Sequence, residues 1–217
     1  AIKKVLDGSN IEPTIRKLFE NDLLIHTEKH PPIGGLEYLP DLLDSIQQRR
    51  RIDVKYLKFQ GERVKTYKIK PLFLKEDKHL WYLIGKNSSN TKMITLALDR
   101  IQDIVITTEV FEEVEFDIDE YYKYSFGVTV TSDQPVEVLI SFSPLQGNYL
   151  KALKIHPTQE IVKDNKEELL IKVKVIPSYE FYSKILSYGS DAKVISPGFI
   201  KNNIAQTLKD AFQSYNG

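Results

Sequence analysis

Basic residues recur along one short stretch of the chain, and their types and spacing suggest that this stretch binds anions. Within residues 63–70 they are Arg63, Lys65, Lys68 and Lys70. Aromatic side chains lie near them in the sequence, namely Tyr56, Phe59, Tyr67 and Tyr82. Lysine and arginine neutralise phosphates while bases stack on aromatic rings, so this combination is typical of a site for a nucleotide or a single strand of nucleic acid.

Other kinds of chemistry have little support in the sequence. His26 and His30 have a spacing that could bind a metal on a helix, but Pro31 follows at once, and we expect no metal site. The acidic run from Glu112 to Asp119 is typical of a solvated linker, and nothing else argues for a glycosidase. The chain has no cysteine, no glycine-rich phosphate loop and no G-x-S-x-G or H-E-x-x-H motif. We therefore predict no cofactor and no enzymatic activity.

Charge is segregated along the chain although the net charge is zero. Residues 49–100 carry 14 basic and 5 acidic side chains, giving +9, whereas residues 101–120 carry 8 acidic and no basic ones, giving −8. Such asymmetry indicates either a site for a polyanion or an electrostatic contact between the two segments, and lysines that simply coat a sheet are a further alternative. No apolar run approaches the ~20 residues that span a bilayer. We expect a cytoplasmic protein that does not bind membranes.

The elements that must position these residues are mostly short strands. Apolar residues at helical spacing predict a helix from Leu36 to the arginine run at 49–51, which could cap its C-terminal end. Closely spaced alternating segments then predict five strands, too close for helical crossovers and therefore antiparallel. They are Ile52–Tyr56, Val64–Leu74, Leu80–Lys86, Lys92–Leu98 and Ile101–Ile106. We predict a small barrel.

The remainder of the chain predicts a second, mixed subdomain. After an acidic connector with a short helix at Ile118–Tyr124, strands and helices alternate in the order β-α-β-β-α-β, followed by a terminal helix from Pro197. This order is typical of a ferredoxin-like α+β sandwich. The segments are Val136–Phe142, Leu145–Leu153, Ile161–Lys163, Leu169–Ile176, Tyr179–Leu186 and Ala192–Ile195.

Several motifs carry a family resemblance. In the predicted barrel they are Lys70-Pro71-Leu72-Phe73-Leu74, Trp81-Tyr82-Leu83 and Leu98-Asp99-Arg100-Ile101. In the second subdomain they are Ser125-Phe126-Gly127, His156-Pro157-Thr158-Gln159, Tyr188-Gly189 and Val194-Ile195-Ser196-Pro197. Together they resemble the WYL-domain family, which takes its name from the tripeptide at 81–83, and the extension that usually follows this domain.

The resemblance implies a bacterial transcriptional regulator with an N-terminal winged helix-turn-helix, an SH3/Sm-like barrel that senses a negatively charged ligand, and the extension. We expect residues 36–106 to form the barrel, 107–133 an acidic connector and 134–217 the ferredoxin-like extension. Residues 1–35 are too few for a winged helix. We expect them to be a linker with a short helix, and duplex DNA to be bound by a domain that this chain lacks.

Among the basic and aromatic residues, Lys68, Lys70 and Arg100 are the predicted ligand contacts, with Tyr56 and Tyr82 as stacking partners. Strand alternation places Lys68 and Lys70 on one face, with Lys65 and Tyr67 on the other. Family members tend to have arginine where this chain has Tyr67, and histidine or an acidic residue where it has Lys70. Tyr56 could instead be a core residue, and Arg100 could pair with Asp99.

The sequence leaves three functions open. The preferred hypothesis is a ligand-sensing, dimerising effector region of a transcriptional regulator. The alternatives are a direct nucleic-acid-binding module and a purely structural oligomerisation module. We expect a homodimer, since regulators of two-fold operators are dimeric, with apolar faces supplied by Ile11–Phe19 and Ile200–Phe212. Trp81 and Leu83 share a strand face, so we expect Trp81 to pack in the core rather than to contact a ligand.

Overall fold

The computed structural model describes residues 34–59, 63–90, 92–131 and 133–216. The predicted helix at Ile11–Phe19, the pair His26 and His30 and the predicted turn at Gln60-Gly61 lie outside these ranges. No helix in the described part of the chain is long and apolar enough to cross a membrane.

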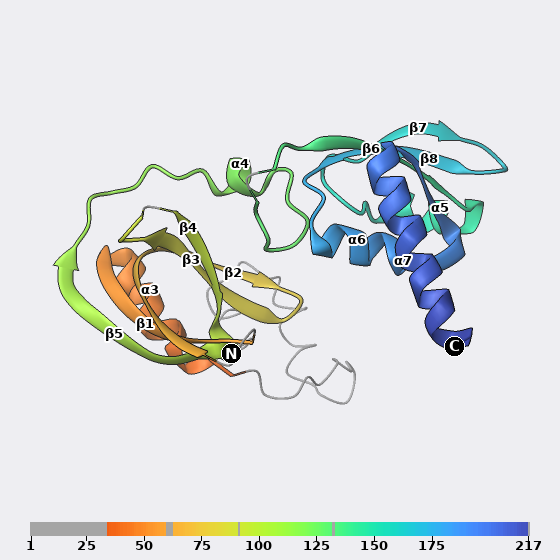
Figure 1. The fold of residues 1–217 in the computed structure, drawn as a ribbon. Coiled ribbons are helices and arrows are strands. Elements are labelled where there is room, and N and C mark those ends of the chain that lie inside the picture. The colour runs from red at the N-terminus through yellow and green to blue at the C-terminus, as the bar shows by residue number, and fades with distance from the viewer. Residues whose placement is uncertain (1–33, 60–62, 91, 132, 217) are drawn as a thin grey trace, which may run out of the picture. The chain divides into compact units, whose positions relative to one another are not determined.

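The first half of the described chain forms a five-stranded antiparallel sheet. A 3-10 turn, η1 (Leu36–Tyr38), leads into α3 (Leu39–Gln47), and the strands have the order β4-β3-β2-β1-β5. They are β1 (Arg50–Lys58), β2 (Arg63–Asp77), β3 (Leu80–Asn87), β4 (Met93–Ala97) and β5 (Ile101–Val110), with a 3-10 turn η2 (Leu98–Arg100) between the last two. The five predicted strands are therefore confirmed, and Figure 1 shows α3 beside the curved sheet.

A single apolar core holds α3 against this sheet. Leu42 of α3 is fully buried with Ile52 and Val54 of β1, Ile69 of β2 and Leu83 of β3. Burying such aliphatic side chains stabilises a fold by about 1.5–3 kcal/mol each. The helix forms because its apolar residues lie on one face that packs on this core, and the strands form because their residues alternate between the core and the outside.

The register of β1 and β2 decides which basic residues can share a site. Val54 lies opposite Tyr67, and Asp53 lies opposite Lys68. Tyr67 and Ile69 are buried in the core, so the residues between and after them point to the other face of the sheet. Lys68 and Lys70 are therefore outward-facing, on the side away from the core.

The basic and acidic segments pair with each other along β1 and β5. Arg51 Nη1 lies 2.6 Å from Glu109 Oε2, and Lys55 Nζ lies 3.0 Å from Asp103 Oδ2. Arg49 has a positive φ of 53° directly after α3, and its Nη1 lies 3.2 Å from Glu113 Oε2. Arg49 thus caps α3 through its backbone N–H, which donates to the Ile46 carbonyl at 3.1 Å, while the side chains of Arg49 and Arg51 pair with the acidic segment. These pairs are exposed, and each contributes at most about 1 kcal/mol.

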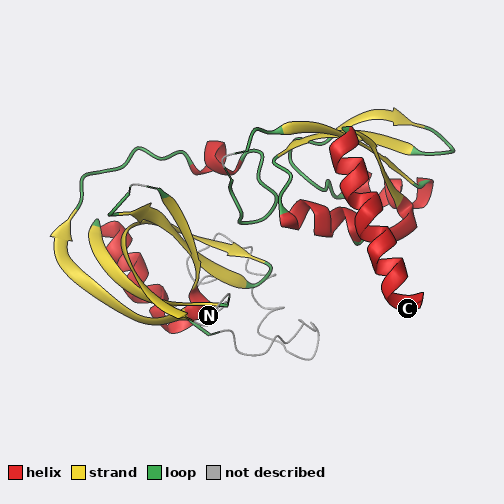
Figure 2. Cartoon of the chain, viewed as in Figure 1, coloured by secondary structure: helices red, strands yellow, loops and turns green. Residues whose placement is uncertain are grey.

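A second antiparallel sheet follows the connector, which contains α4 (Ile118–Tyr122). The elements are β6 (Val136–Phe142), α5 (Pro144–Ala152), β7 (Glu160–Asp164), β8 (Leu169–Val175), α6 (Tyr179–Leu186), β9 (Ala192–Ser196) and α7 (Gly198–Asn216). The strand order is β7-β8-β6-β9. The predicted order of strands and helices is confirmed, and the two sheets are separate (Figure 2).

The helices of this part begin and pack as their sequences indicate. Ser143 caps α5 and Ser178 caps α6, each accepting a hydrogen bond from the backbone N–H three residues on. Ile200 and Ile204 bury the first turns of α7 against the sheet. Beyond Ile204, residues 205–216 are exposed, and α7 continues as one helix to Asn216 (Figure 1).

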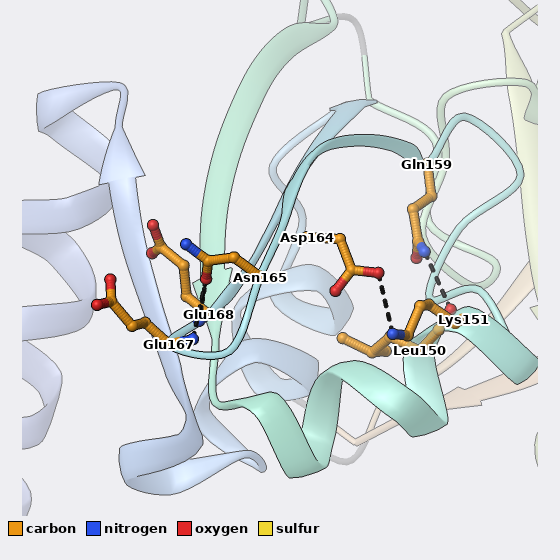
Figure 3. Close-up of polar contacts among 7 residues, drawn as sticks. All are labelled: Leu150, Lys151, Gln159, Asp164, Asn165, Glu167 and Glu168. Carbon is orange, nitrogen blue, oxygen red and sulfur yellow. Dashed lines mark hydrogen bonds and ion pairs between the residues drawn. The ribbon is translucent and has the colours of Figure 1, made fainter.

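Polar contacts link α5 to β7 and order the turn between β7 and β8 (Figure 3). Gln159 Nε2 donates to the Leu150 carbonyl at 3.0 Å, and Lys151 Nζ lies 3.0 Å from Asp164 Oδ2. Asn165 Oδ1 accepts from the backbone N–H groups of residues 167 and 168, both at 2.9 Å, and so forms the turn before β8.

His156 of the His-Pro-Thr-Gln motif has a packing role. It is buried and stacks on Phe126, with ring centroids 5.6 Å apart. Its Nε2 lies 3.1 Å from the Ser125 carbonyl oxygen, and its Nδ1 accepts the Thr158 backbone N–H at 3.2 Å. Burial lowers the pKa of the imidazole, and the hydrogen bond to Ser125 opposes this shift only in part. A neutral histidine therefore ties the connector to the second subdomain.

Candidate anion-binding cavity

The first sheet contains a cavity of about 570 Å³. It is lined by the end of β1, the start of β2, the strand β4 and the turn η2, which are distant in sequence. The lining residues are Tyr56, Lys58, Phe59, Lys65, Tyr67, Asn87, Asn90, Lys92, Met93, Ile94, Thr95, Leu96 and Arg100. Cavities of this volume hold small-molecule ligands.

Four of the lining side chains are cationic, and none of the described ones is acidic. The cations are Lys58, Lys65, Lys92 and Arg100. Like charges that share a small space repel one another, and this repulsion is relieved when an anion enters. The charge of the cavity therefore favours an anionic ligand.

The cations lie against aromatic rings. The Arg100 guanidinium carbon is 5.3 Å from the Tyr56 ring centroid and 4.8 Å from that of Phe59. Lys65 Nζ lies 5.1 Å from the centroid of Tyr67. Cation–π contacts of this length are worth about 0.5–2 kcal/mol and hold the charged groups in place before a ligand binds.

Tyr56, for which the sequence left open a stacking role and a core role, belongs to the core. It is only 4% exposed and meets Tyr67 edge to face, so it is a core residue that also lines the cavity. Its hydroxyl oxygen accepts the Ala97 backbone N–H at 3.3 Å. Burial raises the pKa of the phenol, against a smaller opposing effect of Arg100. Burial leaves Tyr56 no open face for a base, whereas Phe59 is 70% exposed.

Arg100 keeps most of its hydrogen-bonding capacity. Its Nε lies 3.8 Å from Asp99 Oδ1, which is an ion-pair distance but too long for a hydrogen bond. The side chain is 28% exposed, and its buried Nε has no hydrogen-bond partner among the described residues. A guanidinium presents five N–H donors that suit phosphate oxygens. Arg100 is therefore placed to donate to an anion in the cavity.

The structure brings together only part of the predicted ligand set. Arg100 and Tyr56 line the cavity, but Lys68, Lys70 and Tyr82 are not among its lining residues. The sheet register separates Lys68 and Lys70 from Arg100, because the face of β2 that enters the core and reaches the cavity carries Tyr67. Their role as ligand contacts stays a prediction.

The motif residues lie around the core of the same sheet. Leu83 is fully buried, and Trp81 is partly buried and packs against the core cluster, as expected. Tyr82 lies opposite Ala97 of β4, and burial raises the pKa of its phenol. The tripeptide thus contributes to packing, and the described cavity contacts come from other residues.

Lys58, Lys65 and Lys92 are the cavity cations that sequence reasoning did not select. For Lys65 a signal was present, because Tyr67 and Ile69 mark the apolar face of β2 and Lys65 continues that face toward the end of the strand. Lys58 and Lys92 have no such signal. Their position beside the cavity depends on how the sheet curves, and a sequence pattern does not specify this curvature.

Two protein-family models match the chain. The WYL domain matches residues 37–106, which hold the five-stranded sheet and its cavity, and the WCX domain matches residues 134–212, which hold the second sheet and most of α7. Both matches follow one another in the order that the sequence motifs indicated. The chain belongs to the WYL-domain family and carries a WCX domain after the WYL domain.

Solved structures give a weaker comparison. Proteasome accessory factor B/C (PafBC) of Arthrobacter aurescens is 12% identical, with 89% of this chain and 29% of that chain covered and a TM-score of 0.36. A CRISPR Cas-related protein is 11% identical, with 81% of this chain and 50% of that chain covered and a TM-score of 0.51. The chain thus spans half or less of either protein, and only the second likeness supports the fold. No curated protein matches the chain.

Proposed function

We propose that this chain is the ligand-sensing region of a WYL-domain transcriptional regulator and that its cavity binds a phosphate-bearing ligand. The observation that carries the proposal is the set of four cations around one cavity with no acidic residue among its described lining side chains. A nucleotide or a single strand of nucleic acid fits these features, because Phe59 adds an exposed ring for stacking.

The domain arrangement forms part of this proposal. We take the five-stranded sheet with η2 as an SH3/Sm-like barrel over residues 36–106, residues 107–133 as a connector, and residues 134–217 as a ferredoxin-like extension. In the whole regulator, a DNA-binding domain outside this chain contacts duplex DNA, and the ligand state of the cavity biases it. Such coupling requires that the ligand bind two states of the regulator with different affinity.

The placement of charge favours sensing over a purely structural role. The cations on the outer face of β1 have acidic partners, as Lys55 has Asp103 and Arg51 has Glu109. Pairing between the basic and acidic segments therefore accounts for that face. It does not account for Lys58, Lys65 and Lys92, for which no acidic partner is seen among the described residues.

A thermal-shift experiment tests the proposal. Single-stranded DNA, single-stranded RNA, nucleoside triphosphates and inorganic tripolyphosphate are added to the protein at 50 mM salt, since binding to the folded state raises the melting temperature. We expect at least one of them to stabilise the protein and the effect to be lost in Arg100→Gln. The matched control is Lys70→Gln, which removes one charge from the other face of β2. No stabilisation by any of these anions would refute the proposal.

A further inference from the structure

The strand β4 lies at the edge of the described sheet, beside the cavity, and no described strand pairs with its outer side. In the described sheet it pairs only with β3, with Ile94 opposite Gly85. The Asn87 backbone N–H donates to the Lys92 carbonyl at 2.9 Å, which makes these two residues a hydrogen-bonded pair. Hydrogen-bonded and non-hydrogen-bonded pairs alternate along an antiparallel ladder. Ile94 and Leu96 therefore point their backbone groups at β3, and Met93, Thr95 and Ala97 point theirs away from it.

The contact of Tyr56 supports this orientation independently. The Ala97 backbone N–H donates to the Tyr56 hydroxyl at 3.3 Å, so the outward side of β4 faces β1 across the cavity. Tyr56 thereby occupies the edge at Ala97. Met93 and Thr95 both line the cavity, and each directs one N–H donor and one C=O acceptor to that side.

We propose that the outer side of β4 at Met93 and Thr95 recognises a nucleobase, so that the cavity selects nucleotides over other phosphate compounds. The inference rests on the proposed phosphate-binding function and adds a subsite to it. A backbone N–H and C=O on one residue match the adjacent acceptor and donor on the hydrogen-bonding edge of a base. The four cations hold the phosphates, and Phe59 offers its exposed ring to the base.

The length of this edge favours a base over an added peptide strand. From Met93 to Thr95 a strand rises about 7 Å, which suits one base and its neighbour. Strand addition uses a row of main-chain hydrogen bonds along an exposed edge. Here that row ends at Ala97, where the Tyr56 hydroxyl already takes the N–H.

The test compares ligands of similar charge with and without a base. Affinities of the four nucleoside triphosphates and of inorganic tripolyphosphate are measured by isothermal titration calorimetry without magnesium. We expect at least one nucleotide to bind about tenfold or more tightly than tripolyphosphate, from two hydrogen bonds and stacking together. Equal binding of all five would overturn base recognition and leave the phosphate-binding proposal standing. No binding of any of them, or of single-stranded DNA, would remove both.

A backbone substitution locates the effect. Thr95→Pro deletes the outward N–H, and proline is tolerated where an edge N–H makes no ladder bond. We expect the preferred nucleotide to lose about two- to tenfold in affinity while tripolyphosphate is unchanged. Thr95→Val, which keeps the N–H and removes the hydroxyl, is the control and should bind both ligands as the native chain does. An unchanged nucleotide preference in folded Thr95→Pro would overturn the proposal.

A spectroscopic measurement covers the case in which Thr95→Pro does not fold. In the native chain, the ¹⁵N–¹H resonances of Met93 and Thr95 should shift with the preferred nucleotide but not with tripolyphosphate. Shifts of equal size with both ligands would contradict the proposal. So would a glutamate decapeptide that moves these resonances when no nucleotide does, because the edge would then bind a peptide strand.

Discussion

Salt dependence provides a quantitative test of the four cavity cations. Each lysine or arginine that neutralises a phosphate of a single strand contributes about −0.7 to the slope of log K against log salt concentration. Contacts by Lys58, Lys65, Lys92 and Arg100 therefore predict a slope of about −2.8. Between 50 and 200 mM salt the affinity should fall about fifty-fold.

Two double variants with the same change in net charge separate the cavity from the outer face. Lys65→Met with Lys92→Met removes two cavity cations and should lower the slope to about −1.4, so that affinity falls only about sevenfold over the same salt range. Lys68→Met with Lys70→Met removes two cations from the other face of β2 and should leave the slope unchanged. Fluorescence anisotropy with a labelled ten-nucleotide thymidine strand measures both.

The two variants also define the result that would refute the reasoning. If both flatten the slope equally, the strand responds to the overall charge of the domain and not to the cavity. If only the outer pair flattens it, Lys68 and Lys70 carry the contacts, and the sequence-based assignment of these residues would hold against the one drawn from the cavity.

Three other predictions concern stability and assembly. Burial lowers the pKa of His156, so the unfolded chain binds the proton more tightly, and the free energy of unfolding should be full above about pH 6.5 and decrease as the pH falls below it. Thermal melts of the native chain and of His156→Gln at several pH values should show that the variant loses part of this pH dependence. Gly85→Ala should destabilise by about 1–3 kcal/mol in urea melts, because the new Cβ would lie 2.5 Å from the Lys70 carbonyl oxygen; unchanged stability would mean that β2 and β3 can separate locally. Leu208→Glu with Phe212→Glu should turn the expected homodimer into a monomer in light scattering, because both residues are exposed on α7; a native chain already monomeric at high micromolar concentration would contradict the dimer.

Periodicity predicted the elements well, because each is encoded by neighbouring residues. The segments Val136–Phe142 and Tyr179–Leu186 have the predicted bounds, the first from strict alternation. In the structure the second begins after Ser178, which caps it. The positive φ of Gly189, 55°, likewise follows from its place after a helix. Local pattern and local structure agree at these positions.

The lining of the cavity was predicted only in part because it is not local. Arg100 and Tyr56 were selected and do line the cavity, but Lys68 and Lys70 were preferred to Lys65. Alternation states which residues share a face, and it does not state which face is inside. The inner face of β2 is set by Tyr67 and Ile69, which are buried in the core. Lys65 lies on the same face of the strand and therefore borders the cavity.

The charges on the two sides of this sheet have different physical consequences. On the outer face of β1, Lys55 and Arg51 gain partners on β5, so those charges favour solubility and the native register. At the cavity, Lys65 and Lys92 gather near Arg100 with no carboxylate among the described lining residues. Such an arrangement raises the electrostatic energy of the empty domain and lowers that of the anion complex. Repulsion of this kind destabilises the empty folded domain, and a bound anion relieves it, which is why we propose a binding role for the cavity cations.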